Sequence, residues 1–304
     1  MNKAEFIWMD GTFVPWDEAN VHILTHTLHY GNGVFEGTRA YQTEKGLAIF
    51  KLREHTTRLL NSAKITMITP SFDLETLEQA QIELLRKNHF KSNVYLRPLI
   101  FLGYGVMGLY HVSAPVRTAI AAWEWGTYLG EEGLEKGIRV KISSFVRNPA
   151  KSTMGKAKAV ANYLNSQMAK FEAKDAGYDE ALLLDDDGFI AEGSGECFFI
   201  VRNGVLISPP NDNSLESITQ GMVLELARAK GIPVERRRVT RDEVYMADEA
   251  FFTGTAAEVT PIRNVDGRVI GDGARGTMTK ELQEAYFDVV YGRNPAYAHL
   301  LTYI

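Results

Sequence analysis

The sequence lacks three features that would each point to a particular class of protein. It has a single cysteine, Cys197, in 304 residues, so no disulfide can form within the chain. No apolar run approaches the roughly 20 residues needed to cross a bilayer, and the first residues lack the apolar stretch of a signal peptide. Lys and Arg number 33 against 38 Asp and Glu, so no chain-wide positive charge attracts nucleic acid. We therefore expect a cytoplasmic protein that binds neither membranes nor nucleic acid.

Several familiar site motifs are also incomplete. Residues 31–37 resemble a dinucleotide-binding fingerprint, but the glycine spacing is one residue too long and the motif precedes an expected strand. Residues 185–196 imitate a calcium loop, but phenylalanine and isoleucine stand where a ligand and a glycine are required. His22, His26 and His29 have helical spacing without a carboxylate in register. We expect them to pack or to form hydrogen bonds, and we expect no metal site.

The patterns that are present predict an α/β protein of the α+β kind. Residues 1–125 combine short strands with two amphipathic helices, and Asp10-Gly11 is typical of a tight hairpin turn between the first two strands. Residues 126–137 contain four glycines and four charges, as a linker does. Residues 138–304 hold short strands joined by Asp-Gly and Asn-Gly hairpin turns and interrupted by helices. We predict a smaller N-terminal α+β domain (1–125), an interdomain loop (126–137) and a larger C-terminal domain (138–304) with a mixed, barrel-like sheet.

One lysine-rich loop is a candidate for covalent chemistry. Residues 152–163 join an expected strand to an expected helix and carry Lys156 and Lys158 among small residues. A lysine near other cations can have a lowered amine pKa, which makes it a nucleophile toward carbonyl groups. A solvated basic loop is the other interpretation of this stretch.

Two further features could act together with such a lysine in binding a ligand. Glu192 precedes a Gly-Ser-Gly break, where its carboxylate either meets a ligand nitrogen or serves as a turn acid. Residues 217–219 begin a predicted helix, and residues 253–257 form a loop of small residues; both arrangements suit a phosphate. A lysine, a carboxylate and a phosphate cradle are together what a site for pyridoxal 5'-phosphate needs.

The order of these residues resembles the branched-chain amino acid aminotransferases of pyridoxal-phosphate fold type IV, from residue 10 to the C-terminal helix. The same fold serves D-amino acid and (R)-amine aminotransferases and aminodeoxychorismate lyase, which are the alternatives. The anchors of the resemblance are His29-Tyr30-Gly31, Val34-Phe35-Glu36-Gly37, Arg53-Glu54-His55 with Arg58-Leu59, Tyr95-x-Arg97-Pro98, Trp125-Gly126-x-Tyr128-Leu129-Gly130, Lys158 with Asn162-Tyr163, Glu192-Gly-x-Gly195-Glu196 and residues 254–261.

The resemblance implies a role for each cofactor-binding residue. Lys158 would be the catalytic residue, carrying the cofactor as a Schiff base and moving a proton at the substrate. Tyr163 would contact the phenolic oxygen of the cofactor, and Glu192 would pair with its ring nitrogen. The remaining contacts, all to the phosphate, would come from Arg58, Ile218, Thr219 and Thr255.

It also implies a pocket for two kinds of substrate, namely Leu, Ile or Val in one half-reaction and glutamate with 2-oxoglutarate in the other. Tyr95 and the amides of Thr255 and Ala256 would hold the α-carboxylate, and Arg97 would take the distal carboxylate of glutamate. The apolar walls would be Tyr30, Phe35, Trp125, Tyr128 and Tyr163.

The sequence departs from the family pattern in two places. Trp123-Glu124-Trp125 replaces the usual proline before the Trp-Gly pair, and tyrosines 104 and 110 lie in the glycine-rich loop that in the family reaches a neighbouring subunit. These changes suggest a substrate range extended toward larger or aromatic side chains. The shared pocket implies a homodimer or a higher homo-oligomer.

Overall fold

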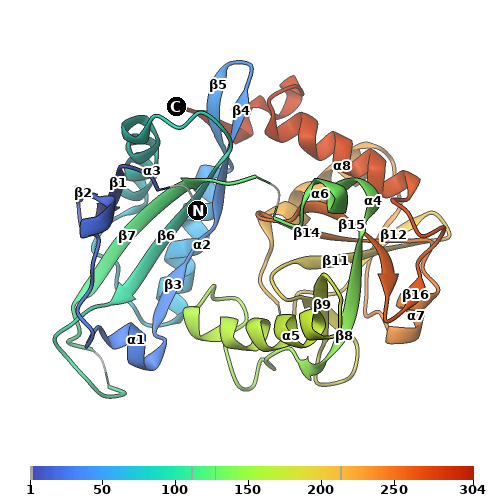
Figure 1. The fold of residues 1–304 in the computed structure, drawn as a ribbon, viewed down its shortest axis with the longest axis horizontal. Coiled ribbons are helices and arrows are strands. Elements are labelled where there is room, and N and C mark those ends of the chain that lie inside the picture. The colour runs from blue at the N-terminus through green and yellow to red at the C-terminus, as the bar shows by residue number, and fades with distance from the viewer. Residues whose placement is uncertain (1–2, 111, 127, 213) are drawn as a thin grey trace. The chain divides into compact units, whose positions relative to one another are not determined.

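The structure, a computed structural model, describes residues 3–110, 112–126, 128–212 and 214–304. It divides into two compact units (Figure 1), each treated by itself below. The first comprises Met1–Gly126, Ala157–Ala161 and Val290–Ile304, and the second comprises Thr127–Lys156 and Asn162–Val289. The segment with Lys158 thus belongs to the first unit, whereas the chain on both sides of it belongs to the second. The expected domains 1–125 and 138–304, with a loop at 126–137, stay a prediction about domain boundaries.

An eight-stranded antiparallel sheet forms the frame of the first unit. Its order is β17-β5-β4-β6-β7-β1-β2, with β3 beside β6. The predicted hairpin at Asp10-Gly11 is confirmed, because these two residues adopt φ angles of 48° and 93° between β1 and β2. The strands are β1 (Phe6–Met9), β2 (Thr12–Pro15), β3 (Gly33–Phe35), β4 (Thr38–Thr43), β5 (Gly46–Phe50), β6 (Val94–Leu102), β7 (Val116–Glu124) and β17 (Leu301–Tyr303).

Helices α2 (Leu52–Ile65) and α3 (Leu74–Asn88) pack against one face of this sheet (Figure 1). Their apolar residues at helical spacing, such as Leu59 and Leu84, share a core with Leu96 of β6. Side chains alternate along a strand, so the neighbours of Leu96 point to the opposite face. That face carries Tyr95 and Arg97, two of the predicted substrate ligands.

A nine-stranded mixed sheet forms the second unit. Its order is β10-β9-β8-β15-β14-β11-β12-β13, with β16 beside β15, and its β8–β9, β8–β15 and β12–β13 pairs are parallel. Helix α5 (Tyr163–Asp175) connects β8 to β9 in a β–α–β unit. The strands are β8 (Ile138–Val146), β9 (Glu180–Leu184), β10 (Ile190–Gly193), β11 (Cys197–Arg202), β12 (Val205–Ser208), β13 (Val234–Arg236), β14 (Glu249–Gly254), β15 (Glu258–Val265) and β16 (Arg268–Val269).

The other helices of this part of the chain include one that the sequence did not predict. α4 (Glu131–Lys136) lies inside the glycine-rich stretch expected as a loop, between Gly130 and Gly137, whose φ angles are 80° and 83°. Acidic residues in its first turn and a lysine in its last turn suit the helix dipole. The remaining helices are α6 (Ile218–Ala229), α7 (Arg241–Tyr245) and α8 (Thr277–Val290).

Helix α1 (His26–Tyr30) explains the three spaced histidines. Nε2 of His26 lies 2.8 Å from the carbonyl oxygen of Gly108, and Nε2 of His29 lies 2.9 Å from that of Ile23. The His22 ring lies 4.1 Å from the Tyr104 ring. The expected packing and hydrogen-bonding roles are therefore confirmed. In the parts of the chain that the structure describes, no helix is long and apolar enough to cross a membrane.

Candidate active site

The backbone around Lys158 is fixed to the first unit by three contacts. The N–H of Lys158 donates to Oγ of Ser62 on α2 at 3.0 Å, and its carbonyl oxygen accepts the N–H of Phe35 at 3.0 Å. Ala159 forms an antiparallel bridge with Val34, so the segment runs beside β3. The Lys158 amine lies 5.0 Å from the centroid of the Phe35 ring. The lysine predicted to react with carbonyls is thus held between a strand and a helix.

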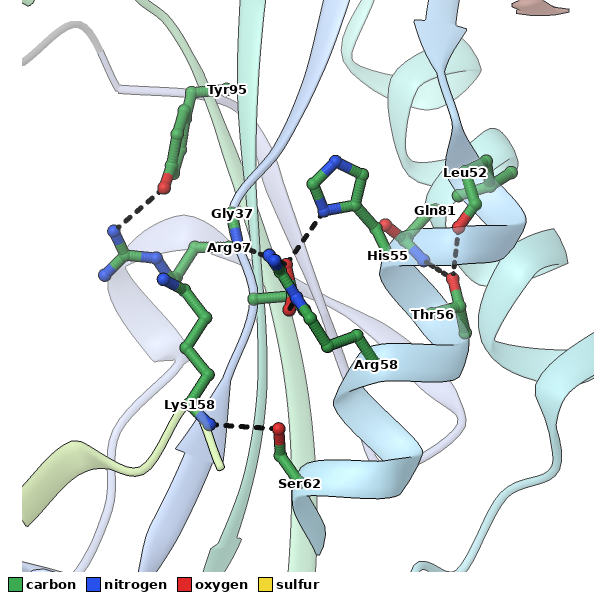
Figure 2. A network of polar contacts seen from close by, with 11 residues as sticks. Gly37, Leu52, His55, Thr56, Arg58, Ser62, Gln81, Tyr95, Arg97 and Lys158 are labelled. Carbon is green, nitrogen blue, oxygen red and sulfur yellow. Dashed lines mark hydrogen bonds and ion pairs between the residues drawn. The ribbon is translucent and has the colours of Figure 1, made fainter. Parts of the chain in front are cut away.

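A buried ion pair joins Arg58 of the same helix (Figure 2) to Glu36, which lies between β3 and β4. Arg58 contacts Glu36 through two nitrogens, with Nε at 2.6 Å from Oε1 and Nη2 at 2.9 Å from Oε2. His55, one helical turn earlier, donates from Nδ1 to Oε2 of Glu36 at 2.9 Å. Burial by itself raises the pKa of Glu36, but the Arg58 charge and the two hydrogen-bonding partners outweigh it and hold that pKa well below its usual range. Glu36 is therefore ionised at neutral pH.

His55 is neutral in this network. Its side chain is buried, and burial lowers the pKa of His55 below its ordinary value, against the opposing effect of Glu36. A neutral ring with its proton on Nδ1 matches the carboxylate it faces. Arg58 is thus neutralised by one full negative charge, and the bidentate pair fixes the plane of its guanidinium. The contact of Arg58 with a phosphate stays a prediction.

Five of the predicted substrate-binding residues lie in the first unit, and all but Tyr30 contact one another. The Tyr95 ring lies 4.8 Å from the Trp125 ring, and the Arg97 guanidinium lies 4.7 Å from the centroid of Phe35 and 5.3 Å from that of Tyr95. Nη2 of Arg97 donates to the Tyr95 hydroxyl at 3.4 Å (Figure 2). Tyr30 lies on α1, where its ring contacts His26 at 4.6 Å.

Gly37 allows Tyr95 its position. A Cβ atom on Gly37 would collide with the hydroxyl and Cζ of Tyr95, so the tyrosine lies directly over the glycine. The chain directly after β7 is held in turn by Arg39, whose Nη2 donates to the carbonyl oxygens of Trp125 at 3.1 Å and Gly126 at 2.7 Å. These contacts give the aromatic residues of this face a fixed arrangement.

In the second unit, Glu192 is accompanied by a buried arginine. Nε of Arg147 lies 2.9 Å from Oε1 of Glu192. Nη1 of Arg147 donates to Asn165 at 3.1 Å and to Ser166 at 3.0 Å, both on α5, while Nη2 donates to the carbonyl oxygen of Gly193 at 2.5 Å. One guanidinium therefore connects the strand that carries Glu192 to the helix that begins at Tyr163.

Two more buried acids lie near this pair. Glu180 accepts a hydrogen bond from Ser194 at 2.7 Å and forms an ion pair with Lys170. Glu196 accepts the N–H of Gly195 at 2.9 Å. Burial, with the negative charges of Glu180 and Glu192, raises the pKa of Glu196 to about 8. Glu196 therefore keeps its proton at neutral pH.

The remaining predicted residues of the second unit lie at the start of α6, between β14 and β15, at the start of α5 and near Lys170. Ser217 accepts the N–H of Gln220 at 3.1 Å, which confirms the predicted cap of α6. Ile218 and Thr219 occupy the first turn of that helix, where amides have no intrahelical acceptor. Thr255 and Ala256 lie between β14 and β15. Tyr163 begins α5, and the Tyr128 ring lies 5.5 Å from the Lys170 amine.

Glu36, His55 and Arg147 are among the residues of these networks that were given no role in the sequence analysis. Glu36 and His55 lie within the motifs quoted there, and the His-x-x-Arg spacing could have indicated that His55 and Arg58 share a helix face. Arg147 had no such signal, because its contacts with residues 165, 166, 192 and 193 are tertiary. Glu124 stands where the family usually has proline, and its Oε1 accepts the N–H of Lys91 at 2.8 Å and of Ser92 at 3.2 Å, closing the turn before β6.

Comparison with known proteins gives the same family by sequence and by structure. The family model for amino-transferase class IV matches residues 33–265. A branched-chain-amino-acid aminotransferase of Pseudomonas aeruginosa is 49% identical, over 98% of this chain and 97% of that protein. The T.th. branched-chain amino acid aminotransferase with pyridoxamine 5'-phosphate superposes with a TM-score of 0.97 at 49% identity, covering 100% of this chain and 99% of that one. The same enzyme complexed with N-(5'-phosphopyridoxyl)-L-glutamate gives a TM-score of 0.95 at 47% identity, with the same coverage.

Proposed function

This chain belongs to the class IV aminotransferase family, and from that premise we propose that it exchanges amino groups between branched-chain L-amino acids and 2-oxoglutarate. The products are the branched-chain 2-oxo acids and L-glutamate. The cofactor is pyridoxal 5'-phosphate, which supplies an aldehyde for amines and a ring that accepts electrons. Two observations carry the proposal. The chain is 49% identical to a branched-chain enzyme over 98% of its length, and Lys158 is held beside the buried Arg58–Glu36 pair.

The donor set of the chain fits this cofactor. Lys158 provides an amine, and Arg58 provides a cation whose orientation is set by Glu36. The first turn of α6 provides amides for a phosphate, and Glu192 provides a carboxylate for a ring nitrogen. The Arg147 guanidinium, whose Nε lies 2.9 Å from Oε1 of Glu192, holds that carboxylate in place.

The residues of this chain also have clear tasks toward the substrate. Lys158 takes and returns the proton at the substrate Cα, and its neighbours Ser62 and Phe35 hold the backbone from which it reaches. Tyr95, fixed over Gly37, binds the α-carboxylate. The aromatic rings of Phe35 and Trp125 exclude water from a branched apolar side chain, and Arg97 binds the distal carboxylate of glutamate.

The test is a half-reaction titration of the purified holoenzyme. L-leucine should convert the cofactor absorbance band, whereas D-alanine and (R)-1-phenylethylamine should leave it unchanged. Lys158→Ala should abolish both the band and turnover. Lys156→Ala is the matched control, because the Lys156 amine is bound elsewhere, 3.4 Å from Glu216, and should keep turnover. Conversion by D-alanine but not by L-leucine would overturn the substrate assignment.

We further propose that the protein is a homo-oligomer, at least a dimer. Large apolar side chains are exposed around α1 and along residues 104–110 of the first unit, with Ile23 73%, Leu28 60%, Leu109 86% and Tyr110 83% exposed. Patches of this kind mark interaction surfaces, and a second copy of the chain is the occupant we propose. Light scattering should give at least twice the 34.0 kDa chain mass, and Leu109→Ser with Ile23→Ser should reduce it.

We also propose that the protein works in the cytoplasm. Its single cysteine is buried in β11 and can form no disulfide within the chain, as is usual for proteins of a reducing compartment. Cell fractionation followed by immunoblotting tests this location, and recovery in a membrane or secreted fraction would contradict it.

A further inference from the structure

Arg97 lies on the same face of the first sheet as Tyr95, and it has no carboxylate partner among the described residues. Among the described residues, none of the acidic side chains forms an ion pair with Arg97, and its buried Nε has no hydrogen-bond partner. Its guanidinium lies instead beside three rings, at 4.7 Å from Phe35, 5.3 Å from Tyr95 and 5.9 Å from Trp123, measured to their centroids. Attraction to the negative faces of the rings therefore takes the place of an ion pair.

The strand register explains how Trp123 reaches this arginine. Tyr95 of β6 pairs with Trp123 of β7, and Arg97 pairs with Ala121. Trp123 is thus the diagonal neighbour of Arg97 on the same face, at a distance that long and aromatic side chains can span. The small Ala121 leaves room for the guanidinium beside the indole. Trp123 is only 9% exposed, so its contact with Arg97 is shielded from water.

Aromatic rings and a carboxylate occupy different parts of an arginine guanidinium. Rings contact the face of a guanidinium and leave its N–H edge available, whereas a carboxylate occupies that edge. Arg58 illustrates the second case, since Glu36 occupies two of its nitrogens. An arginine held by rings can bind a substrate carboxylate without first breaking an ion pair. When the substrate is leucine, the same rings present an apolar surface.

We propose that Trp123 is a specificity-determining residue that positions Arg97 for the distal carboxylate of a dicarboxylic amino donor. This proposal rests on the proposed function, which assigns glutamate to one half-reaction. Trp123 acts through Arg97 and touches neither the cofactor nor the reacting atoms. Its loss therefore changes the discrimination between glutamate and leucine rather than the chemistry common to both.

The experiment measures the affinity of the holoenzyme for each amino acid from the cofactor absorbance in separate half-reactions. Trp123→Leu should lower the ratio of glutamate affinity to leucine affinity about 3- to 30-fold, the range that a shielded cation–π contact supports. Trp123→Phe, which keeps a ring face, should restore most of the ratio. Trp8→Leu is the matched control. Trp8 is a buried tryptophan of the same sheet that packs on Phe72 instead, so the ratio should not change.

A double-mutant cycle with Arg97→Met separates the possible outcomes. If Trp123 acts through Arg97, then Trp123→Leu has no further effect on the ratio in the Arg97→Met background. Equal loss of both affinities in Trp123→Leu, or full additivity in the cycle, would overturn the proposal. Thermal melting of each variant identifies misfolding, and in that case Trp123→Phe and Trp123→Met carry the test. Failure of the unsubstituted enzyme to react with L-leucine would overturn the proposed function itself.

Discussion

Glu36 in the first unit and Glu196 in the second are both buried carboxylates, yet their pKa values move in opposite directions. Glu36 faces one arginine and one neutral histidine, and its pKa is held well below the usual range. Burial raises the pKa of Glu196, which has two further acids nearby, to about 8. Burial acts in the same direction on both groups, so the difference comes from the cations available to each.

The comparison shows how the buried carboxylates of each unit are compensated. In the first unit one carboxylate matches one guanidinium, and no proton is needed. In the second unit Glu180, Glu192 and Glu196 share Arg147 and Lys170, and the third negative charge is removed by a retained proton. The two clusters should therefore respond differently to substitution and to pH.

The largest loss of stability is expected when the Glu36–Arg58–His55 cluster of the first unit loses its carboxylate. Glu36→Gln leaves the Arg58 charge without its carboxylate and should lower the free energy of unfolding by about 3–5 kcal/mol. Urea denaturation at pH 7 measures the change. Glu54→Gln is the control, because its ion pair with Lys51 lies at the surface and should cost less than about 1 kcal/mol. If the two variants were equally stable, the Glu36–Arg58 pair would not contribute the stability expected of a buried ion pair.

The next largest loss of stability is expected when a cation is removed from the acid-rich cluster of the second unit, which contains Glu180, Glu192 and Glu196. Arg147→Met eliminates the contact with Glu192 and the hydrogen bonds to α5 and Gly193, so we expect a loss of about 2–4 kcal/mol. Arg147→Lys keeps the charge but not the forked geometry, and its loss should be intermediate. The same urea experiment ranks the three proteins. A methionine variant as stable as the parent would mean that the guanidinium is not needed to hold Glu192.

Opposite pH responses follow from the two pKa shifts. The pKa of Glu196 is raised from 4.5 in the unfolded chain to about 8, so its stabilisation is complete below pH 4.5 and is lost as the pH rises to 8. The pKa of Glu36 is lowered, so its stabilisation is complete above pH 4.5 and is lost in acid. Glu196→Gln, which mimics the protonated acid, should remove a slope of up to about 1.4 kcal/mol per pH unit between pH 5 and 8.

Unfolding free energies of the parent and of Glu196→Gln, measured at pH 5, 6, 7 and 8, test this response. The two proteins should differ least at pH 5, and the variant should be the more stable protein at pH 8. Parallel curves across the range would show that Glu196 does not hold the proton. Glu243→Gln is a suitable control, because the pKa of Glu243 is lowered by Arg237 at the surface and its effect lies in acid.

The sequence was sufficient for features that depend on neighbours along the chain. Hydrophobic spacing predicted α2 and α3, the Asp10-Gly11 turn predicted the first hairpin, and Ser217 marked the start of α6. These features follow from backbone geometry and capping, which act over a few residues. The order of motifs also predicted the family before any comparison.

Features that depend on contacts between distant residues were missed. β17 pairs with β5, although most of the chain separates the two strands, and α4 appeared where glycines suggested a loop. Arg147 lies in an expected loop after a strand, and nothing near it in sequence reveals the carboxylate it meets. Trp123 was noted as a departure from the family pattern, but its position beside Arg97 depends on the β6–β7 register. Pairing of this kind is decided by the folded sheet.

The smallest effect concerns a single hydrogen bond in the acid-rich cluster. Ser194→Ala removes the 2.7 Å hydrogen bond to Oε1 of Glu180 and should cost about 0.5–1.5 kcal/mol. The slope of stability between pH 5 and 8 should remain, because burial and the neighbouring acids that raise the pKa of Glu196 are unchanged. A variant that loses the slope altogether would mean that the serine, and not the shortage of cations, retains the proton in this unit.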